Sequence, residues 1–549
     1  MPDDQWSWDL PKRAQSSDDE EPSIRIRHAL HRPKRAARAV KEASSSDFGR
    51  TVGFTVAGAV IPGLGLIAAN RRKVGAIVLG FFLLLVVGLG LWALIDLPSM
   101  VRAVLSPTLL KIVTIGLVLL ALVWVGVIVV TNLSLSRGPL TRAQRVISSV
   151  LVGVLAFVVA APMAVAARYS YDQAGLVSTV FRGQKDSHSA TRPTAQPTHR
   201  KDPWKDKPRV NVLLLGGDAG KDRIGTRTDT VMVASIDTKT GDTTLISLPR
   251  NTAKMPFPED SPLQEYYPYG FTDGDGQNAE YFLNAMYPNV PNQVPEDVLG
   301  KTDDLGADVL KLSVGEATGL SIDYYALINL AGFRQLIDAL GGITVNINTY
   351  VAIGGSTDEG IPPKDWLEPG PDQHLDGGKA LWFARGRYGA DDFQRMDRQR
   401  CVVNAIIDQA NPANVVTRYE AIVKAGKDIV QTDIPQEALP AFVDLSTRVK
   451  DGNVRSLVFK NGVKGFSSAD PDYDLMRERV DKALGEAKEE PKKSDSDKKD
   501  SDDDQGEDSG SDDSSTSPSP SASSSAESES AKDACAWQPD VAAKAQRPS

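Results

Sequence analysis

The globular part of the chain opens with a short apolar run, VNVLLLGGD at residues 210–218. The apolar residues are followed at once by two glycines and Asp218, a pattern typical of a buried strand that leads into a loop. Two β-branched runs, 230–236 and 243–248, enclose DTKTGD at 237–242 and predict a hairpin. This part of the chain is therefore expected to contain a sheet with polar residues beside its strand ends.

Helical patterns follow these strands. Apolar periodicity predicts helices at 307–318, 327–340, 378–385 and 398–410, with one more strand at 343–347. Mixed strands and helices of this kind predict an α/β fold, a layered sandwich.

Composition divides the 549 residues into several parts, and only about 205–480 has the composition of a globular domain. The net charge of −9 comes largely from an acidic tail, and no nucleic-acid-binding module is recognisable. The expected parts are a basic disordered segment (1–50), an interfacial or re-entrant apolar segment (51–69), three transmembrane helices (74–168), an extracellular linker (169–207), the domain (208–480) and a disordered, acidic, Ser-rich tail (481–549).

Three apolar segments, 74–95, 109–133 and 146–167, are long enough to cross a bilayer. Arg and Lys cluster before the first and between the second and third, and such loops stay in the cytoplasm. Three crossings then place the domain outside the cell, in a multi-pass protein of the cell membrane. A crossing by 51–69 would reverse this orientation, but four glycines and Pro62 favour an interfacial or re-entrant segment.

Several kinds of site are excluded. The glycine spacing at 216–222 is wrong for a phosphate-binding P-loop, and His374 is the one histidine in the domain, so a histidine metal cluster is excluded. Cys401 lies in an apolar helical run and is expected to be a buried thiol. Cys535 lies in the tail and receives no role.

Acids and arginines remain as candidates for chemistry. A pair of carboxylates suits magnesium, and converging arginines suit a phosphate or pyrophosphate. A lone arginine is more often a solvated surface charge. That alternative weakens here because several arginines stand beside strand ends and glycines. The candidates are Asp218, Arg227, Asp229, Arg250, Arg385, Arg387, Arg395 and Gln399.

Ordered sequence blocks now form a recognisable pattern. Together they resemble the LytR-CpsA-Psr domain over about residues 208–412. The blocks are VLLLGGD (212–218), RTDT (227–230), SLPRNT (247–252), LNAMY (283–287), IDYY (322–325), DALGGITV (338–345), LDGGKALWFARGR (375–387), DFQR (392–395) and RQR (398–400).

The resemblance implies a three-layer α-β-α sandwich with a mixed central sheet, preceded by transmembrane helices. It implies a phosphotransferase that moves a glycopolymer, such as teichoic acid, from an undecaprenyl-diphosphate carrier onto peptidoglycan, with pyrophosphate cleavage as a side activity. The lipid would occupy an apolar groove between sheet and helices. The partners would be the lipid-linked glycopolymer, the peptidoglycan acceptor and the membrane.

The resemblance also implies roles for individual residues. Asp218 and Asp229 would hold Mg²⁺ or Mn²⁺, and Asp229 is also the candidate general base. The catalytic set would be Arg250, Arg385, Arg387 and Asp229. The pyrophosphate would be bound by Arg227, Arg250, Arg385, Arg387, Arg395 and Gln399.

Three positions depart from the family pattern and put acceptor or head-group recognition in question: Asn251 replaces an aspartate, Phe282 replaces a lysine, and 259–277 is longer and more acidic.

Two alternative functions stay open. One is a non-catalytic envelope regulator or polymer-binding module, and the other is a lipid-diphosphate hydrolase. A composition rich in Ala, Arg and Gly is typical of a high-GC actinobacterium.

Overall fold

The computed structural model describes residues 48–95, 106–136, 141–193, 204, 207–218, 226–274, 278–357, 359–409, 430–489 and 528–548, without the side chains of 93, 176, 218 and 486–489. The chain forms two compact units. Residues 1–91 and 117–164 make up the first, and residues 92–116 and 165–549 make up the second.

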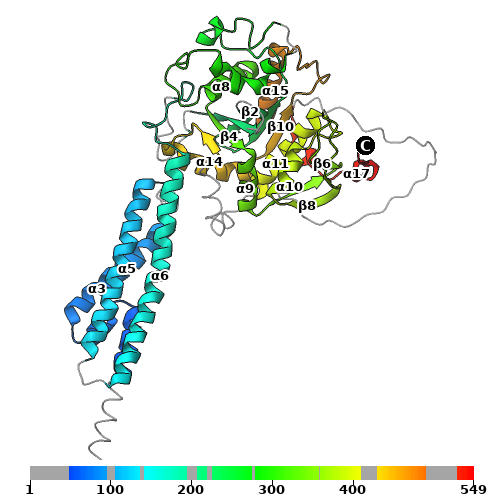
Figure 1. The fold of residues 1–549 in the computed structure, drawn as a ribbon. Coiled ribbons are helices and arrows are strands. Elements are labelled where there is room, and N and C mark those ends of the chain that lie inside the picture. Colours follow the sequence, from blue (N-terminus) through cyan, green and yellow to red (C-terminus); the bar gives the residue numbers. More distant parts are fainter. Residues whose placement is uncertain are drawn as a thin grey trace, which may run out of the picture. The chain divides into compact units, whose positions relative to one another are not determined.

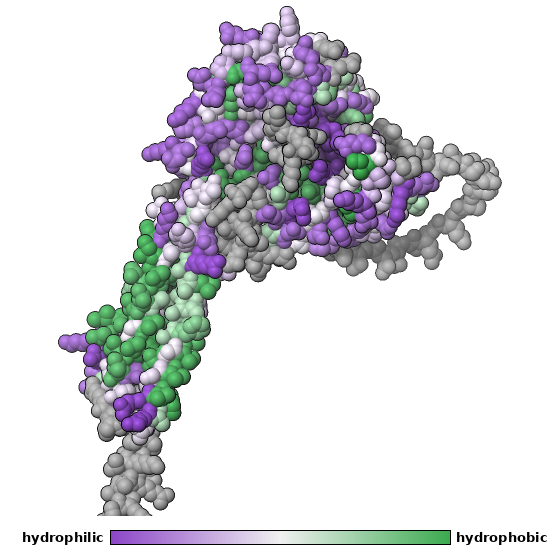
Figure 2. Space-filling view, viewed as in Figure 1, coloured by the Kyte–Doolittle hydropathy of each residue, from purple (hydrophilic) through white to green (hydrophobic). Residues whose placement is uncertain are grey.

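Three long helices carry the apolar segments of the sequence. They are α3 (Arg72–Ile95), α5 (Pro107–Leu135) and α6 (Arg142–Val180). All three are long and apolar enough to cross a membrane. Their outer surfaces are covered by apolar side chains, which appear green in Figure 2. The three predicted membrane helices are confirmed as elements, because each expected segment falls inside one of them.

The apolar segment 51–69 forms a helical hairpin in the first unit. One helix spans 48–60, and α2 (Leu64–Ala68) follows a turn in which Gly63 has a φ of 100°. Each limb is shorter than the roughly 20 residues that a crossing needs. Side chains of α5 bind the hairpin: Trp124 Nε1 donates to the Ala59 carbonyl at 3.0 Å, and Asn132 donates to Thr55 Oγ1 at 3.3 Å. Its interpretation as a re-entrant segment stays a prediction.

A seven-stranded mixed sheet forms the centre of the second unit (Figure 1), in the order β11-β10-β3-β2-β1-β4-β9. β1 pairs with β4 and β3 with β10 in parallel, and the other neighbours are antiparallel. The strands are β1 (Arg209–Asp218), β2 (Arg227–Asp237), β3 (Thr243–Leu248), β4 (Tyr324–Asn329), β9 (Val430–Thr432), β10 (Val454–Val458) and β11 (Glu529–Ser530).

Helices cover both faces of this sheet. Because strand side chains alternate, Leu213 and Leu215 face one layer of helices while Val212 faces the other. The first layer contains α7 (Leu283–Asn289), α8 (Leu305–Thr318) and α15 (Tyr473–Glu489). The second contains α9 (Leu330–Leu340), α10 (Gly377–Arg385), α11 (Asp392–Gln409) and α14 (Leu439–Asp451). The three-layer sandwich with a mixed sheet is confirmed.

Smaller elements complete this unit. Two small antiparallel sheets have two strands each. One consists of β5 (Ile343–Ile347) with β8 (Gly370–Leu375), and the other of β6 (Val351–Ile353) with β7 (Asp365–Leu367). The short helices are η1 (Pro262–Glu265), η2 (Ala279–Tyr281), η3 (Val290–Asn292), η4 (Gln436–Ala438), α16 (Ala531–Ala534) and α17 (Pro539–Lys544).

The linker prediction for 169–207 was wrong over residues 169–193. Helix α6 continues to Val180, and residues 183–193 pack on the domain. Asp308 is almost fully buried and accepts hydrogen bonds from Ser189 Oγ at 2.7 Å and the Ala190 amide at 2.8 Å. A buried carboxylate needs such donors, so a Ser- and Thr-rich segment that looks like a tether becomes ordered. Residues 194–203, 205 and 206 lie outside the described residues.

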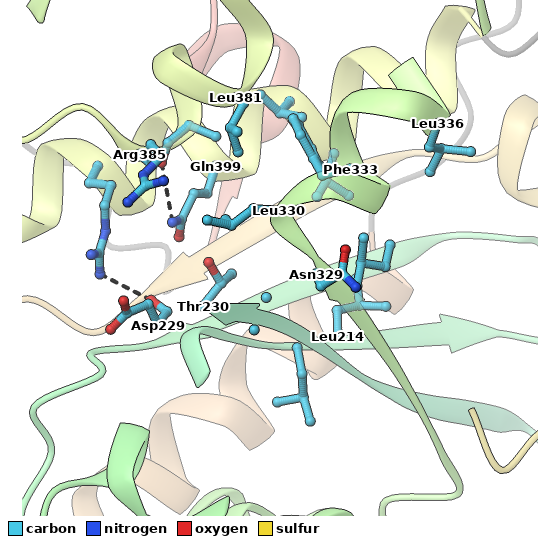
Figure 3. Close-up of a pocket in the computed structure, with 18 of the residues that line it drawn as sticks. Leu214, Asp229, Thr230, Asn329, Leu330, Phe333, Leu336, Leu381, Arg385 and Gln399 are labelled. Carbon is cyan, nitrogen blue, oxygen red and sulfur yellow. Dashed lines mark hydrogen bonds between the residues drawn. The ribbon is translucent and has the colours of Figure 1, made fainter. Parts of the chain in front are cut away.

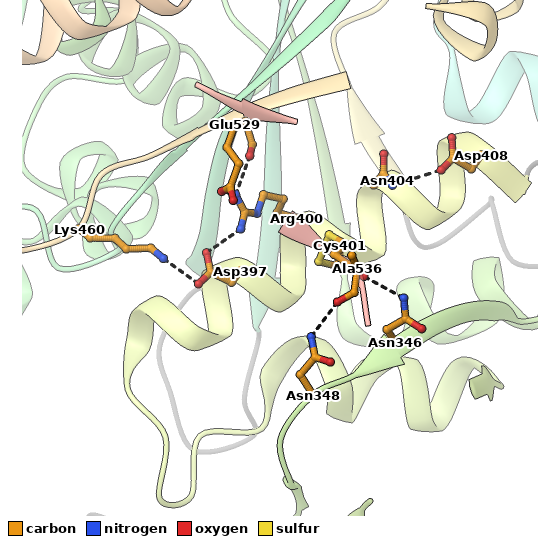
Figure 4. The surroundings of a disulfide bond; sticks show 12 residues. Asn346, Asn348, Asp397, Arg400, Cys401, Asn404, Asp408, Lys460, Glu529 and Ala536 are labelled. Carbon is orange, nitrogen blue, oxygen red and sulfur yellow. Dashed lines mark hydrogen bonds and ion pairs between the residues drawn. A yellow bond between two sulfur atoms is a disulfide. The ribbon is translucent and has the colours of Figure 1, made fainter. Parts of the chain in front are cut away.

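The predictions for the two cysteines and the tail also need correction. Cys401 is not a buried thiol but forms a disulfide with Cys535, with a Cα–Cα distance of 5.6 Å. Residues 528–548 are folded into the domain, and β11 extends the central sheet (Figure 4). The composition of the tail is dominated by the charged stretch that precedes residues 528–548. For this reason composition does not distinguish this short folded segment. Residues 1–47 and 490–527 of the predicted disordered parts lie outside the described residues.

Candidate active site

A cavity lies between the sheet and the second helix layer (Figure 3). Its empty volume is about 1120 Å³, which includes the part open to solvent. Strands β1, β2 and β4 form one wall, and α9, α10 and α11 form the other. Most of its lining is apolar, from side chains such as Leu330, Phe333, Leu336, Leu381 and Ile406. One end is polar and contains Asp229, Arg385, Arg387, Arg395 and Gln399.

A β-bulge places Asp229 in the cavity wall. Gly216 pairs with Thr230 and Gly217 pairs with Thr228, so Asp229 is the extra residue in β2. Thr228 is fully buried, whereas Asp229 and Thr230 both line the cavity. Bulges often redirect a side chain beside a functional site. The neighbouring glycines leave no room for a side chain, since a Cβ on Gly216 would come within 2.9 Å of Thr230.

Asp229 belongs to a network of alternating charges. Arg250 Nη1 donates to Asp229 Oδ1 at 2.8 Å, and Arg250 Nε lies 3.4 Å from Asp392 Oδ1. Arg395 Nη2 donates to Asp392 Oδ2 at 3.0 Å and to the main-chain oxygen of Asp229 at 3.1 Å. Asn284 Nδ2 adds a contact of 3.3 Å to Asp229 Oδ1. The network holds both arginine side chains in one orientation.

The environment sets the protonation states of this network. Burial raises the pKa of Asp229, but the charges of Arg250 and Arg395 outweigh it and leave the pKa below its ordinary value. Burial lowers the pKa of Arg395 to about 10, against the opposing effect of Asp392. At neutral pH Asp229 is therefore ionised and Arg395 is protonated. A carboxylate with a lowered pKa is a poor proton acceptor, which favours the ligand role of Asp229 over its role as base.

Arg385 and Arg387 enter the cavity from the end of α10. Asp376 caps the start of the helix, since its carboxylate accepts from the Lys379 amide. The helix ends at Arg385, so Arg387 lies in the loop beyond it. The guanidinium of Arg385 lies 5.2 Å from the centre of the Trp382 ring. Gln399 Nε2 donates to the Ala384 carbonyl at 3.3 Å and ties α11 to this helix end.

Two predicted site residues are seen neither in the cavity wall nor in the charge network around Asp229. Arg227 forms an ion pair with Glu280 and is not among the residues that line the cavity. The backbone of Asp218 ends β1 opposite Arg227, but its side chain lies outside the described residues. The other predicted residues come together: Asp229, Arg385, Arg387, Arg395 and Gln399 line the cavity, and Arg250 binds Asp229.

A divalent cation fits this end of the cavity. Asp229 Oδ1 is taken by Arg250 and Asn284, while Oδ2 accepts no hydrogen bond from any residue that the structure describes. Among the described residues no group of three acidic, histidine or cysteine side chains converges. One or two carboxylates together with substrate phosphates are a usual magnesium site. Asp229 supplies one such carboxylate, and the backbone of Asp218 lies at the end of the neighbouring strand.

Sequence reasoning missed three residues that shape the site. Asn284 and Asp392 complete the network, and Arg398 is a buried support. Arg398 Nε donates to the Phe383 carbonyl at 2.7 Å, and its Nη2 contacts the Gly386 carbonyl, so it holds the end of α10. All three lie inside motif blocks of the sequence. Their position in these blocks was the signal that could have identified them as site residues. The sequence could not show which residues they bind, because their hydrogen-bond and ion-pair partners come from other segments of the chain.

The departures from the family pattern lie in the first helix layer and around it. Asn251 is exposed beside Arg250, and Phe282 is the residue before α7. The acidic segment 259–277 is folded over residues 259–274, because Leu263 and Phe271 are fully buried in the core between the sheet and the first helix layer. Residues 275–277 lie outside the described residues.

Comparisons with known proteins place similar sequences along this part of the chain. The sequence model of the LytR_cpsA_psr family matches residues 177–487. The polyisoprenyl-teichoic acid–peptidoglycan teichoic acid transferase TagU of Oceanobacillus iheyensis is 30% identical over 280 residues, which is 50% of this chain and 73% of that protein. TagU of Enterococcus faecalis is 31% identical over 233 residues, 42% of this chain and 63% of that protein. The crystal structure of Bacillus subtilis TagV aligns with a TM-score of 0.35 at 24% identity, covering 51% of this chain and 97% of that one.

Proposed function

Because the chain belongs to the LytR_cpsA_psr family, we propose that it is a phosphotransferase of cell-wall assembly. The donor is a glycopolymer carried on a polyprenyl diphosphate, and the acceptor is a hydroxyl of peptidoglycan. Relatives named as teichoic acid transferases support this reaction class.

The observation that carries the proposal is the two-part lining of the cavity. Its polar end presents Arg385, Arg387 and Arg395, and the rest of its wall is apolar. Guanidinium groups bind phosphate oxygens through paired hydrogen bonds, and a prenyl chain needs an apolar surface. A lipid diphosphate has a charged diphosphate and an apolar chain in one molecule. The diphosphate suits the polar end of the cavity, and the chain suits its apolar part.

The residues of the chain account for most of what the reaction needs. The acceptor oxygen attacks the sugar-linked phosphorus, the bond to the bridging oxygen breaks, and polyprenyl phosphate leaves. The proton of the acceptor hydroxyl passes to solvent. Arginines that outnumber the carboxylates stabilise the charge on the transferred and departing phosphates. Arg250 and Arg395 are held in place before substrate binds, because Asp229 and Asp392 bind them from two sides.

Asp229 and Asp218 would hold Mg²⁺ or Mn²⁺ beside the diphosphate. When bound, the cation neutralises phosphate charge. Asp229 contributes an ionised carboxylate with one oxygen left for the metal. The position of Asp218 at the end of β1 makes it the second ligand in this proposal.

We place the enzyme in the cell membrane as a multi-pass protein with the domain on the outside. The distribution of Arg and Lys around α3, α5 and α6 supports this orientation. A topology reporter fused after Arg182 should be active outside the cytoplasm, and one fused after Arg137 inside. Opposite signals at both points would contradict the orientation.

The function is tested with full-length protein in detergent, a synthetic polyprenyl-diphosphate-linked disaccharide and peptidoglycan fragments. The expected product is a disaccharide joined to peptidoglycan through a phosphodiester, with one polyprenyl phosphate released per transfer. Release of polyprenyl phosphate without any joined product, even at saturating acceptor, would identify a hydrolase. Donor binding without release would identify a non-catalytic binding protein.

A further inference from the structure

The C-terminal segment, residues 528–548, is attached to the domain at both of its ends. Strand β11 pairs with β10, and the Arg455 side chain donates to Ser528 Oγ at 2.9 Å. Farther on, Asn346 Nδ2 donates to the Cys535 carbonyl at 3.0 Å, and the Gln538 amide donates to Asn348 Oδ1 at 2.9 Å. These contacts fix a segment that no part of the proposed chemistry uses.

The C-terminal segment touches the first of the two elements that supply arginines to the polar end of the cavity. Helix α11 carries Arg395 and Gln399, and the next two residues of this helix contact the segment (Figure 4). Arg400 Nη1 lies 3.2 Å from Glu529 Oε2, and Cys401 forms the disulfide with Cys535. The segment is therefore bound within one helical turn of Gln399.

It also touches the second element, residues 385–391, which we call the arginine loop. Pro548 packs against Gly389, so closely that a Cβ on Gly389 would come within 2.1 Å of Pro548 Cβ. Beside it, the Arg547 guanidinium lies 5.3 Å from the centre of the Tyr350 ring and 2.6 Å from Glu368 Oε1. None of the residues 528–548 lines the cavity, so any effect on the reaction acts through these supports.

We propose that the C-terminal segment is a positioning element of the active site, which holds the arginine loop and α11 so that Arg385, Arg387, Arg395 and Gln399 keep their mutual geometry. The disulfide anchors the segment, and Pro548 is its contact with the loop. This inference rests on the proposed function. The physical reason is that preorganised charges act most strongly in a transition state when they need not move into place.

The main test uses the full-length protein in detergent with residues 547–549 deleted, which leaves the disulfide and β11 in place. With the disaccharide donor and peptidoglycan fragments, kcat is expected to fall at least five-fold while KM and the melting temperature change little. Lys544→Ala, an exposed position in the same segment, is the matched control and should keep wild-type kinetics. A purely structural role would lower the melting temperature and leave kcat per folded molecule unchanged.

A double-mutant comparison tests the contact itself. Gly389→Ala is strained in any background because its φ is 67°, but the Cβ meets Pro548 only in the full-length chain. We expect the substitution to lower kcat by a larger factor in the full-length protein than in the protein that lacks 547–549. Equal factors in both would contradict a direct contact. Cys535→Ser, which releases the anchor, should lower kcat in the same direction.

The outcomes separate the two proposals. A wild-type protein that does not transfer the disaccharide overturns the proposed function and this inference with it. An active wild type whose deletion variant has unchanged kcat overturns the positioning role alone.

Discussion

The two parts of the cavity differ in how they are built. The polar end draws on short motif blocks of the sequence, and its charges are fixed by ion pairs such as Arg250 with Asp229. The apolar part is assembled from single side chains of β1, β4, α9, α10 and α11, and no ion pair holds them. Chemistry should therefore depend on a few residues at one end, while lipid affinity should be spread over many residues at the other.

The largest effect is expected from Arg385→Ala or Arg387→Ala. Each charge-assisted contact to phosphate is worth about 1.5–3 kcal/mol, so diphosphate affinity should fall at least about ten-fold and transfer should be abolished. Both residues lie at the polar end and outside the core, so the melting temperature should not change. Arg334→Ala on the outer side of α9 is the control for loss of one arginine. Full turnover in both variants would show that the diphosphate binds elsewhere.

The second-largest effect on transfer is expected from Asp229→Asn. The amide keeps the shape but removes the charge that would bind the cation. Because loss of outer partners alone often costs about 10- to 100-fold in metal affinity, loss of a ligand should cost at least about 100-fold. Transfer is measured against Mg²⁺ concentration, with Asp392→Asn as the control, since Asp392 also pairs with Arg250 and Arg395. An unchanged half-saturating Mg²⁺ concentration in Asp229→Asn would rule out the ligand role.

Phe333→Ala should affect the apolar part alone. Burial of a Phe side chain is worth about 1.5–3 kcal/mol, so affinity for geranylgeranyl diphosphate should fall at least about ten-fold. Affinity for isopentenyl diphosphate, whose short chain cannot reach far beyond the polar end, should stay the same. Arg387→Ala should weaken both ligands by a similar factor. Equal losses for both ligands in Phe333→Ala would remove the distinction between the two parts.

The difference between the polar end and the apolar part of the cavity also explains which site residues could be predicted from the sequence. Arg385, Arg387 and Asp229 stand in blocks short enough to be recognised, and the sheet could be predicted from apolar runs such as 210–215. The wall residues Leu336 and Ile406 belong to ordinary amphipathic helices, and only the packing of distant elements makes them neighbours. The bulge at Asp229 depends on a register shift between two strands, which no local pattern reports.

Composition wrongly predicted that two segments are unfolded, because it does not report contacts with distant parts of the chain. Residues 183–193 and 528–548 are short and polar, and each is ordered by partners far along the chain. Asp308 orders the first, and Cys401 orders the second across 134 positions of sequence. A rule based on local hydrophobicity cannot register such partners.

The smallest expected effect is the pH dependence of stability at the polar end. The pKa of Asp229 is lowered in the folded protein, so its carboxylate stabilises the fold above the unfolded pKa and loses that contribution as the pH falls through the folded pKa. In the full-length protein, the difference in melting temperature between wild type and Asp229→Asn should thus be largest near neutral pH and should narrow below about pH 4. The difference should be a few degrees, since about 1 kcal/mol shifts Tm by roughly 2–4 °C in a domain of this size. Other carboxylates titrate in both proteins and cancel in the comparison. A difference that widens on acidification would mean that burial, and not Arg250 and Arg395, dominates the energetics of Asp229.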